Sequence, residues 1–456
     1  MILLPAALSL AHAGDPFLTM EHVLSSPAAS QRPAEACAQL ASPAAPMSLA
    51  DVVERALCAN PDTRLAWINS RIRAAELGQA QSAYLPSVSA SAGGARTGNE
   101  ILPKDHWAWN AGLNASYLLY DFGGRDANRA QAEALLAAAN DSHEVVVRQL
   151  FGNVVQTYFG LWAARRSVDA TAQSEAAALE TLKAASARVQ AGVAVPADKL
   201  QAQTAYSRRR LDRLVAEGNA ATLQGELANL MGLPAQTAYA LQEPKEMLPG
   251  FNLEQIDKLI EEAKARRPEL AAAQAQVDAS QAALGVARAS GKPSISLAAA
   301  SFYQDSGPVA GYSSSVGVNV SIPIFTGYDT TYRIRAAQEQ VRQAQVEQER
   351  TDQTVALEVW RAWQGVRTSV ETFRQSADLL DSAQAAEKLA RGRYQGGLGI
   401  VLDVLNAQAE TANARLTQLQ SRYQLDTSRS ELARAVGELV WNVLDSANKP
   451  ATGERQ

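Results

Sequence analysis

Residues 393–406, RYQGGLGIVLDVLN, join two long helical runs that are rich in Ala and Gln. The three glycines of this stretch permit the positive backbone angles that end one helix and reverse the chain. Residues 188–201, RVQAGVAVPADKLQ, have the same layout, with a proline suited to the first turn of the following helix. Both stretches are therefore predicted to form the tips of helical hairpins, at residues 190–198 and 395–403.

The two tips are copies of one another. Four residues in or beside the first stretch recur 205 positions later, namely Arg188 as Arg393, Gly192 as Gly397, Asp198 as Asp403 and Gln203 as Gln408. Matches at one offset indicate an internal duplication. We therefore expect an extended arm at 14–47, a first repeat at 48–246, a second repeat at 247–445 and a C-terminal tail at 446–456.

Each repeat contains a very long helix. Helical periodicity in the first repeat runs without a breaker from about residue 125 to about residue 190, close to 100 Å at about 1.5 Å per residue. A helix of this length does not fit a compact domain. Its apolar residues keep the three- and four-residue spacing of a coiled-coil seam, so we expect it to pack against other helices.

Each repeat also contains two segments in which apolar and small or polar residues alternate, a pattern that predicts β-strands. We place the four strands at about 86–95, 107–120, 293–304 and 312–325. Each is about as long as a tilted membrane strand needs to be. Aromatic residues gather near the strand ends, where membrane interfaces would lie: Trp107, Trp109, Tyr117, Tyr120, Phe302, Tyr303, Tyr312 and Phe325.

A soluble, half-buried sheet is the general alternative for such strands. Four strands per chain are too few to close a membrane barrel, so several chains would have to pool them. Three chains would supply twelve strands.

Composition excludes several classes of function. The 42 Lys and Arg residues are balanced by 47 Asp and Glu residues without a basic block, which argues against nucleic-acid binding. The four histidines are scattered, and no known catalytic, phosphate-binding or metal-binding motif occurs. We therefore expect no enzyme activity, no cofactor and no metal site.

The first residues indicate export. Residues 1–13 form an apolar run that ends in the small-x-small pattern of a signal peptidase site, although the usual basic residues before it are missing. An apolar N-terminal stub is the alternative. In an exported chain the only two cysteines, Cys37 and Cys58, are predicted to form a disulfide, the alternative being two unrelated buried thiols.

The ordered set of helix, proline, β-hairpin, long helix, glycine-rich tip and return helix, present twice, resembles the TolC family of trimeric outer-membrane efflux and secretion channels. The resemblance extends from about residue 48 to residue 444. The segments that carry it are AYLP at 83–86, YDFGG at 120–124, GKPS at 291–294, IFTG at 324–327, YQGG at 394–397 and DVL at 403–405.

This resemblance implies an α+β membrane protein of the cell outer membrane with a large periplasmic portion. Three protomers would share a twelve-stranded outer-membrane β-barrel that continues into a periplasmic α-helical barrel. The expected partners are outer-membrane lipid, a periplasmic adaptor (membrane fusion) protein, and an inner-membrane ABC transporter or proton-driven pump that supplies the energy.

The resemblance also assigns residues to a periplasmic gate. Asp198 and Asp403 would line the pore, and Tyr394 would latch it shut. The sequence departs from some members at Gly399, where they carry a latch arginine, and at Asn406, where they carry a second aspartate, so the gate is expected to have fewer charged links. Without the resemblance, each aspartate is simply favoured in the first turn of a helix. The adaptor would dock at the tips, on Gly192, Val193, Gly397 and Leu398.

Within the family, the cysteine pair and the absence of a lipid-anchor cysteine are more similar to the type I secretion branch, the CyaE-like exporters of large toxins. We therefore expect a passive duct for type I protein secretion. One alternative is the outer-membrane channel of a drug or metal efflux pump. Another is a periplasmic coiled-coil scaffold without a pore, against which the four amphipathic strands argue.

Overall fold

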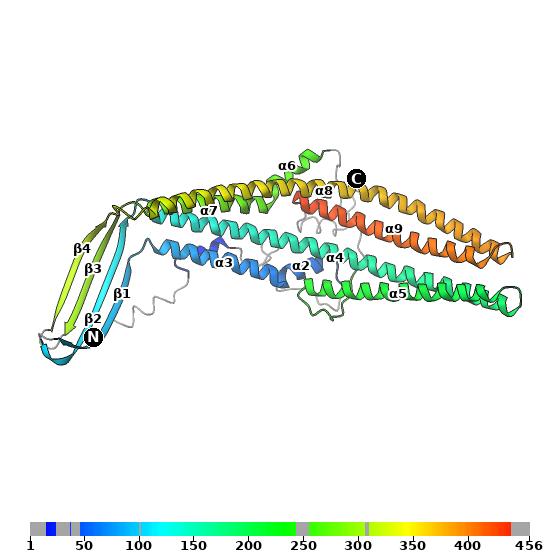
Figure 1. The fold of residues 1–456 in the computed structure, drawn as a ribbon, viewed down its shortest axis with the longest axis horizontal. Coiled ribbons are helices and arrows are strands. Elements are labelled where there is room, and N and C mark those ends of the chain that lie inside the picture. The colour runs from blue at the N-terminus through cyan, green and yellow to red at the C-terminus, as the bar shows by residue number, and fades with distance from the viewer. Residues whose placement is uncertain are drawn as a thin grey trace, which may run out of the picture. The chain divides into compact units, whose positions relative to one another are not determined.

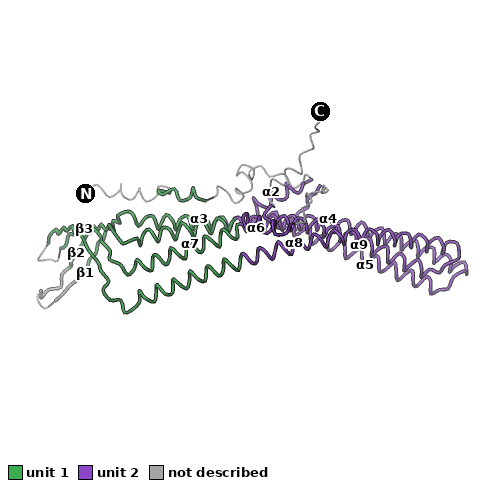
Figure 2. The backbone as a smooth tube through the Cα atoms, turned by 90° about the horizontal axis from the view of Figure 1, so that it is seen from above, with its two compact units in different colours: residues 1–24, 67–143, 268–351 green, residues 25–66, 144–267, 352–456 purple. Residues whose placement is uncertain are grey.

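The computed structural model describes residues 15–23, 37, 46–99, 102–242, 255–305 and 310–438. The expected signal peptide, most of the expected N-terminal arm and the expected tail lie outside these residues. The chain divides into two compact units, one of residues 1–24, 67–143 and 268–351 and the other of residues 25–66, 144–267 and 352–456 (Figure 2). Each unit contains segments of both sequence repeats.

The helices and strands follow the same order twice along the chain (Figure 1). The first repeat forms α2 (Leu49–Ala59), α3 (Pro61–Ser82), β1 (Ser87–Asn99), β2 (Leu102–Tyr120), α4 (Gly124–Gln190) and α5 (Pro196–Leu230). The second forms α6 (Ile256–Arg266), α7 (Pro268–Ala289), β3 (Ser294–Asp305), β4 (Ala310–Ser321), α8 (Asp329–Gln395) and α9 (Val401–Val436). The duplicated arrangement of helices, hairpin and long helix is thus confirmed, and α4 and α8 both contain 67 residues.

The first unit holds a four-stranded antiparallel sheet in the order β1-β2-β3-β4. The central pair, β2 and β3, joins the two repeats (Figure 1), and Leu113 pairs with Ser301. In the described part of the chain, neither β1 nor β4 has a partner on its outer edge. β4 ends at Ser321, before the expected end at residue 325, because Pro323 has no backbone N–H to donate to a neighbouring strand.

Sharp corners connect the sheet to the long helices. Phe122 and Gly123 have positive φ angles of 55° and 93° before α4, and Gly327 and Tyr328 have φ angles of 62° and 67° before α8. At the first corner, the side chain of Asp121 accepts a hydrogen bond of 2.6 Å from the backbone N–H of Arg125 and so caps α4. These corners account for the glycines in the segments at 120–124 and 324–327.

The second unit contains the largest cluster of buried side chains, where the short helix α2 packs on α4 and α5. Val52, Val53 and Leu57 of α2 are fully buried, as is Tyr158 of α4. The Tyr158 hydroxyl donates a hydrogen bond of 2.7 Å to the carbonyl of Gln242, and burial raises its pKa to about 12. Cys37 and Cys58, 21 positions apart, form a disulfide beside this cluster.

None of the helices in the described residues is both long enough and apolar enough to cross a bilayer.

The backbone at Gly232, just after α5, comes close to Ala59 at the end of α2. Gly232 has a φ angle of 70°, and an added Cβ would lie 2.8 Å from the carbonyl oxygen of Ala59. We expect Gly232→Ala to lower the free energy of unfolding by about 2 kcal/mol or more, through backbone strain and the clash together. Thermal unfolding of the purified protein measures this change.

Gly192→Ala is the matched control, because Gly192 has a φ angle of 75° but no atom within 4 Å of an added Cβ. It therefore carries the cost of backbone strain alone. Equal losses of stability in the two variants would show that the contact with Ala59 contributes nothing.

A candidate gate at the hairpin tips

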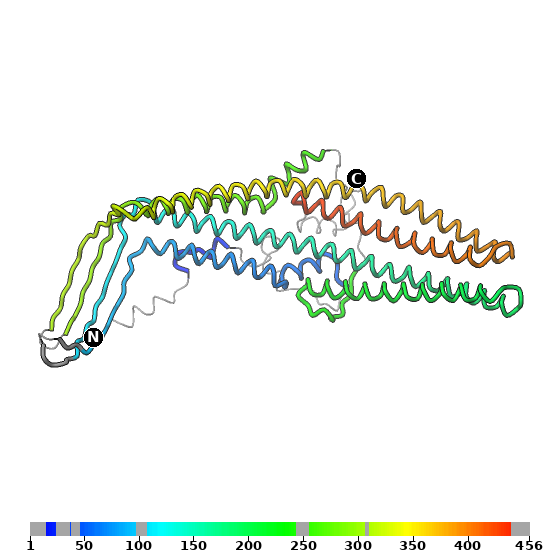
Figure 3. The backbone as a smooth tube through the Cα atoms, viewed as in Figure 1, coloured from blue at the N-terminus to red at the C-terminus, as the bar shows by residue number. Residues whose placement is uncertain are grey.

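The two hairpin tips have the same backbone geometry and lie at the same end of the second unit (Figure 3). Gly192 and Gly397 both have a φ angle of 75°, which only glycine adopts without strain. In each tip, the amide after this glycine donates to a carbonyl five residues earlier: Val193 to Arg188 at 3.0 Å, and Leu398 to Arg393 at 2.8 Å. Both long helices therefore end in the same left-handed cap.

Apolar side chains are exposed on both tips. Val193 is 66% exposed and Leu398, its copy in the second repeat, is 78% exposed. Further exposed apolar side chains lie beside them: Val195, Leu200, Ile400 and Leu402. Exposed apolar groups that gather in one place mark an interaction surface. The expected docking residues Val193 and Leu398 lie on this surface, and the expected docking residues Gly192 and Gly397 form the turns beneath them.

A small buried cluster joins the two hairpins just above the tips. Tyr394, at the end of α8, is buried together with Val401 and Val404 of α9. Ala185 of α4 and Ala202 of α5 complete the cluster. The fully buried side chains of the first hairpin are thus both alanines, with Leu182 of α4 packed beside them.

Arg188 of the first hairpin holds Tyr394 of the second. The guanidinium carbon lies 4.6 Å from the centroid of the tyrosine ring, within the range of a cation–π interaction. The same guanidinium donates a hydrogen bond of 2.8 Å to the backbone carbonyl of Tyr394. Among the described residues, the buried Tyr394 hydroxyl has no hydrogen-bond partner.

The sequence did not indicate this role for Arg188, which we singled out only as a copy of Arg393. Arg393 is exposed in the structure, whereas Arg188 is half-buried. The two arginines differ in exposure because Arg188 packs on the ring of Tyr394. The sequence did contain a signal that the two tips differ. The residue that matches Tyr394 in the first tip is Val189, so the two tips cannot make the same contacts.

The expected pore carboxylates project from the first turns of the return helices. Asp403 is exposed and Asp198 is half-buried. Within the described residues, neither carboxylate forms a hydrogen bond or an ion pair with another side chain. Asn406, one turn after Asp403, is also exposed. Each aspartate is also favoured in the first turn of its helix by the helix dipole.

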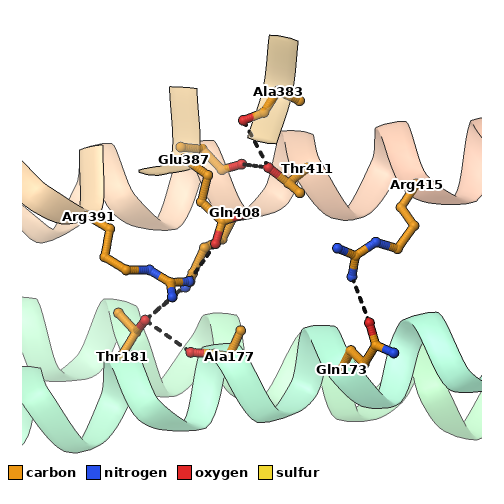
Figure 4. A network of polar contacts seen from close by, with 10 residues as sticks. Gln173, Ala177, Thr181, Ala383, Glu387, Arg391, Gln408, Thr411 and Arg415 are labelled. Carbon is orange, nitrogen blue, oxygen red and sulfur yellow. Dashed lines mark hydrogen bonds and ion pairs between the residues drawn. The ribbon is translucent and has the colours of Figure 1, made fainter. Parts of the chain in front are cut away.

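Polar contacts continue between the hairpins further from the tips (Figure 4). Gln408 of α9 donates a hydrogen bond of 3.0 Å to the hydroxyl of Thr181 on α4, and Arg415 of α9 donates one of 3.2 Å to the side-chain oxygen of Gln173 on α4. These contacts border a groove of about 1040 Å³ between the hairpins. The charged side chains that line it are four arginines, Arg208, Arg209, Arg391 and Arg415, and two acids, Asp212 and Glu387.

The residues that the structure describes contain no group of three or more His, Cys, Asp or Glu side chains that could hold a metal ion.

Comparison with known families identifies the same duplication. The model of the outer membrane efflux protein family matches residues 52–233 and, a second time, residues 259–438. Protein CyaE of Bordetella pertussis is 30% identical over 407 residues, which cover 88% of this chain and 86% of CyaE. A toluene efflux pump outer membrane protein, TtgI of Pseudomonas putida, is 25% identical over 411 residues, which cover 86% of this chain and 85% of TtgI.

Solved structures share the fold. The crystal structure of the CmeC outer membrane channel of Campylobacter jejuni superposes with a TM-score of 0.74 at 22% identity, over 86% of each chain. The helices, hairpins and long helices therefore have the arrangement of a known channel fold.

The contact between Arg188 and Tyr394 predicts local stability at the tips. We expect Arg188→Ala to speed amide hydrogen exchange in residues 394–405 about tenfold, because one charged hydrogen bond and one cation–π contact are lost. Arg393→Ala removes the matching arginine of the other tip, which is exposed, and should leave exchange in these residues unchanged. Similar exchange in the two variants would contradict the assigned role of Arg188.

Proposed function

Because the chain belongs to the outer membrane efflux protein family, and is therefore an outer-membrane channel with a periplasmic helical part rather than an enzyme, we propose that it is the passive duct of a type I protein-secretion system. Channels of this family form trimers within tripartite systems. Family membership thus argues against a coiled-coil scaffold without a pore.

The pairing of the sheet supports a trimer that closes through β1 and β4. Strand edges with unpaired backbone groups cannot remain exposed in a membrane, since each unpaired group costs several kcal/mol. The free edge of β4 in one protomer would pair with the free edge of β1 in the next. Three copies of the four-stranded sheet then give a closed barrel of twelve strands.

The similarity to CyaE, together with the disulfide between Cys37 and Cys58, favours polypeptide as the cargo. The second candidate is the outer-membrane channel of a drug or metal efflux pump, which the similarity to the toluene efflux protein TtgI supports at lower identity. The two candidates differ in the transporter that accompanies the duct, because the duct itself performs no chemistry.

At the tips, Tyr394 would act as the latch and Arg188 would hold it. The link between Arg188 and Tyr394 keeps the second hairpin against the first, so that the tips move as one body while it is intact. Asp403 and Asp198 would face the pore, where three copies of each carboxylate gather negative charge and attract cations. Asn406 leaves one position in this region uncharged.

The carboxylates of the gate predict the ion selectivity of the channel. We expect Asp403→Ala to lower the preference for K⁺ over Cl⁻, because three negative charges leave the constriction, and Asn406→Asp to raise it, because three are added. Reversal potentials of single channels in a KCl gradient measure both changes. Glu371→Gln removes an exposed charge from α8 far from the tip and should have no effect. Selectivity that is equal in all four proteins would contradict the gate.

The exposed apolar surface of the tips would bind the periplasmic adaptor. Val193 and Leu398 stand out from the turns formed by Gly192 and Gly397, and their exposure to water costs free energy that a docked partner would recover. An adaptor that grips both tips would also bridge the hairpins joined by Arg188 and Tyr394. Docking and opening would then act on the same residues.

Crosslinking in native membranes, followed by mass spectrometry of the purified complex, tests the proposal. We expect an adaptor and an inner-membrane ABC exporter to be recovered with the channel, and Val193→Asp or Leu398→Asp to lose both while the trimer persists. Leu389→Asp, at a side chain 65% exposed on α8 before the tip, is the matched control. A proton-driven pump in place of the ABC exporter would favour drug or metal efflux, and recovery of neither would contradict a tripartite duct.

A further inference from the structure

The two faces of the four-stranded sheet have opposite character. One face carries exposed apolar side chains along every other position of β4, namely Val316, Val318 and Val320. The pairing places further apolar side chains beside them on this face, because Leu297 lies opposite Val318 and Tyr303 lies opposite Tyr312. The positions between them on β4 are small or polar: Gly311, Ser313, Ser315, Gly317 and Asn319. The apolar face suits lipid and the polar face suits a water-filled pore.

Phe302 breaks this pattern. It lies on the polar face of β3, in a row that runs across the sheet through Ser91, Gly112, Phe302 and Ser313. It is the one large side chain of this row, and it is 39% exposed. Its sequence neighbour Tyr303 lies on the opposite face and packs against Tyr312, with ring centroids 4.9 Å apart. Phe302 is therefore at the level of an aromatic belt but faces the other way.

The ring of Phe302 lies directly over Gly112 of β2. A Cβ added to Gly112 would overlap two carbon atoms of the ring, so no larger residue fits there unless the ring moves. Glycine inside a strand lacks a side chain for packing and weakens the strand, and it often marks a place of close approach. Gly112 thus provides the space in which the ring rests against the wall of the sheet.

We infer that Phe302 lines the pore, and that three copies form an apolar constriction near the outer end of the channel that contacts the apolar side chains of an exported polypeptide. This inference rests on the proposed function, since it needs the trimeric pore. β3 leaves α7 at Ser294 and ends at Asp305, so Phe302 lies near the strand end away from the helices. Three flat apolar rings in a polar wall offer stacking and hydrophobic contact to a passing chain and narrow the pore at their level.

The test measures access to a site below the constriction. Ser296 lies on the same polar face, six residues nearer the helices, which is about 20 Å along the strand. In intact cells that carry Ser296→Cys, a maleimide linked to polyethylene glycol and added outside should label the cysteine, as seen by a gel shift. The disulfide keeps Cys37 and Cys58 from reacting. We expect Phe302→Ala to speed labelling several-fold and Phe302→Trp to slow it.

Two further variants separate the constriction from a general disturbance of the sheet. Tyr303→Ala removes an aromatic ring at the same level on the other face, and labelling should proceed at the unchanged rate. Gly112→Ala pushes the Phe302 ring away from β2 and should slow labelling, but not in the variant that also carries Phe302→Ala. Rates that do not depend on residue 302 overturn the inference alone. A trimer in which Ser296→Cys is never labelled, even with Phe302→Ala, overturns the proposed pore as well.

Discussion

The pairing of β2 with β3 is the interaction on which the rest of the molecule depends. Each repeat alone would have a two-stranded hairpin, which is at best marginally stable, whereas the pairing gives one sheet of four strands. It also places the corners that start α4 and α8 on one sheet. Both helices contain 67 residues, and the tips that end them lie in the second unit.

The two tips differ in their side chains and not in their backbone. The backbone of the tips is the same, down to the φ angles of Gly192 and Gly397. The side chains are not, since one tip supplies the arginine and the other supplies the tyrosine that it holds. A duplication gives two equivalent hairpins, and substitutions in one copy then turn an equivalent pair into a complementary one. The buried cluster above the tips is also unequal, since the first hairpin buries two alanines in it and the second buries one tyrosine and two valines.

A duct has to be tight along its wall and yet able to open at its end. The second unit meets the first need with the buried cluster around α2 and with the disulfide, which together fasten the N-terminal part of the chain to α4 and α5. In the proposed gate the tips would meet the second need, because five buried side chains and one arginine join the hairpins there. A partner that docked on the exposed apolar side chains, as we propose, would have little packing to displace.

The amino-acid sequence by itself determined the order and type of the elements, the duplication and the two tips, because helix periodicity, strand alternation and the turns at Gly192 and Gly397 are local properties of the chain. It also indicated a link between Cys37 and Cys58. Only the tertiary structure decided that Arg188 covers Tyr394 and that Phe302 lies over Gly112. Each contact joins residues about 200 positions apart. The contact of Phe302 with Gly112 depends on the register in which β2 meets β3, and the contact of Arg188 with Tyr394 depends on how the two hairpins pack. No local pattern in the sequence encodes either.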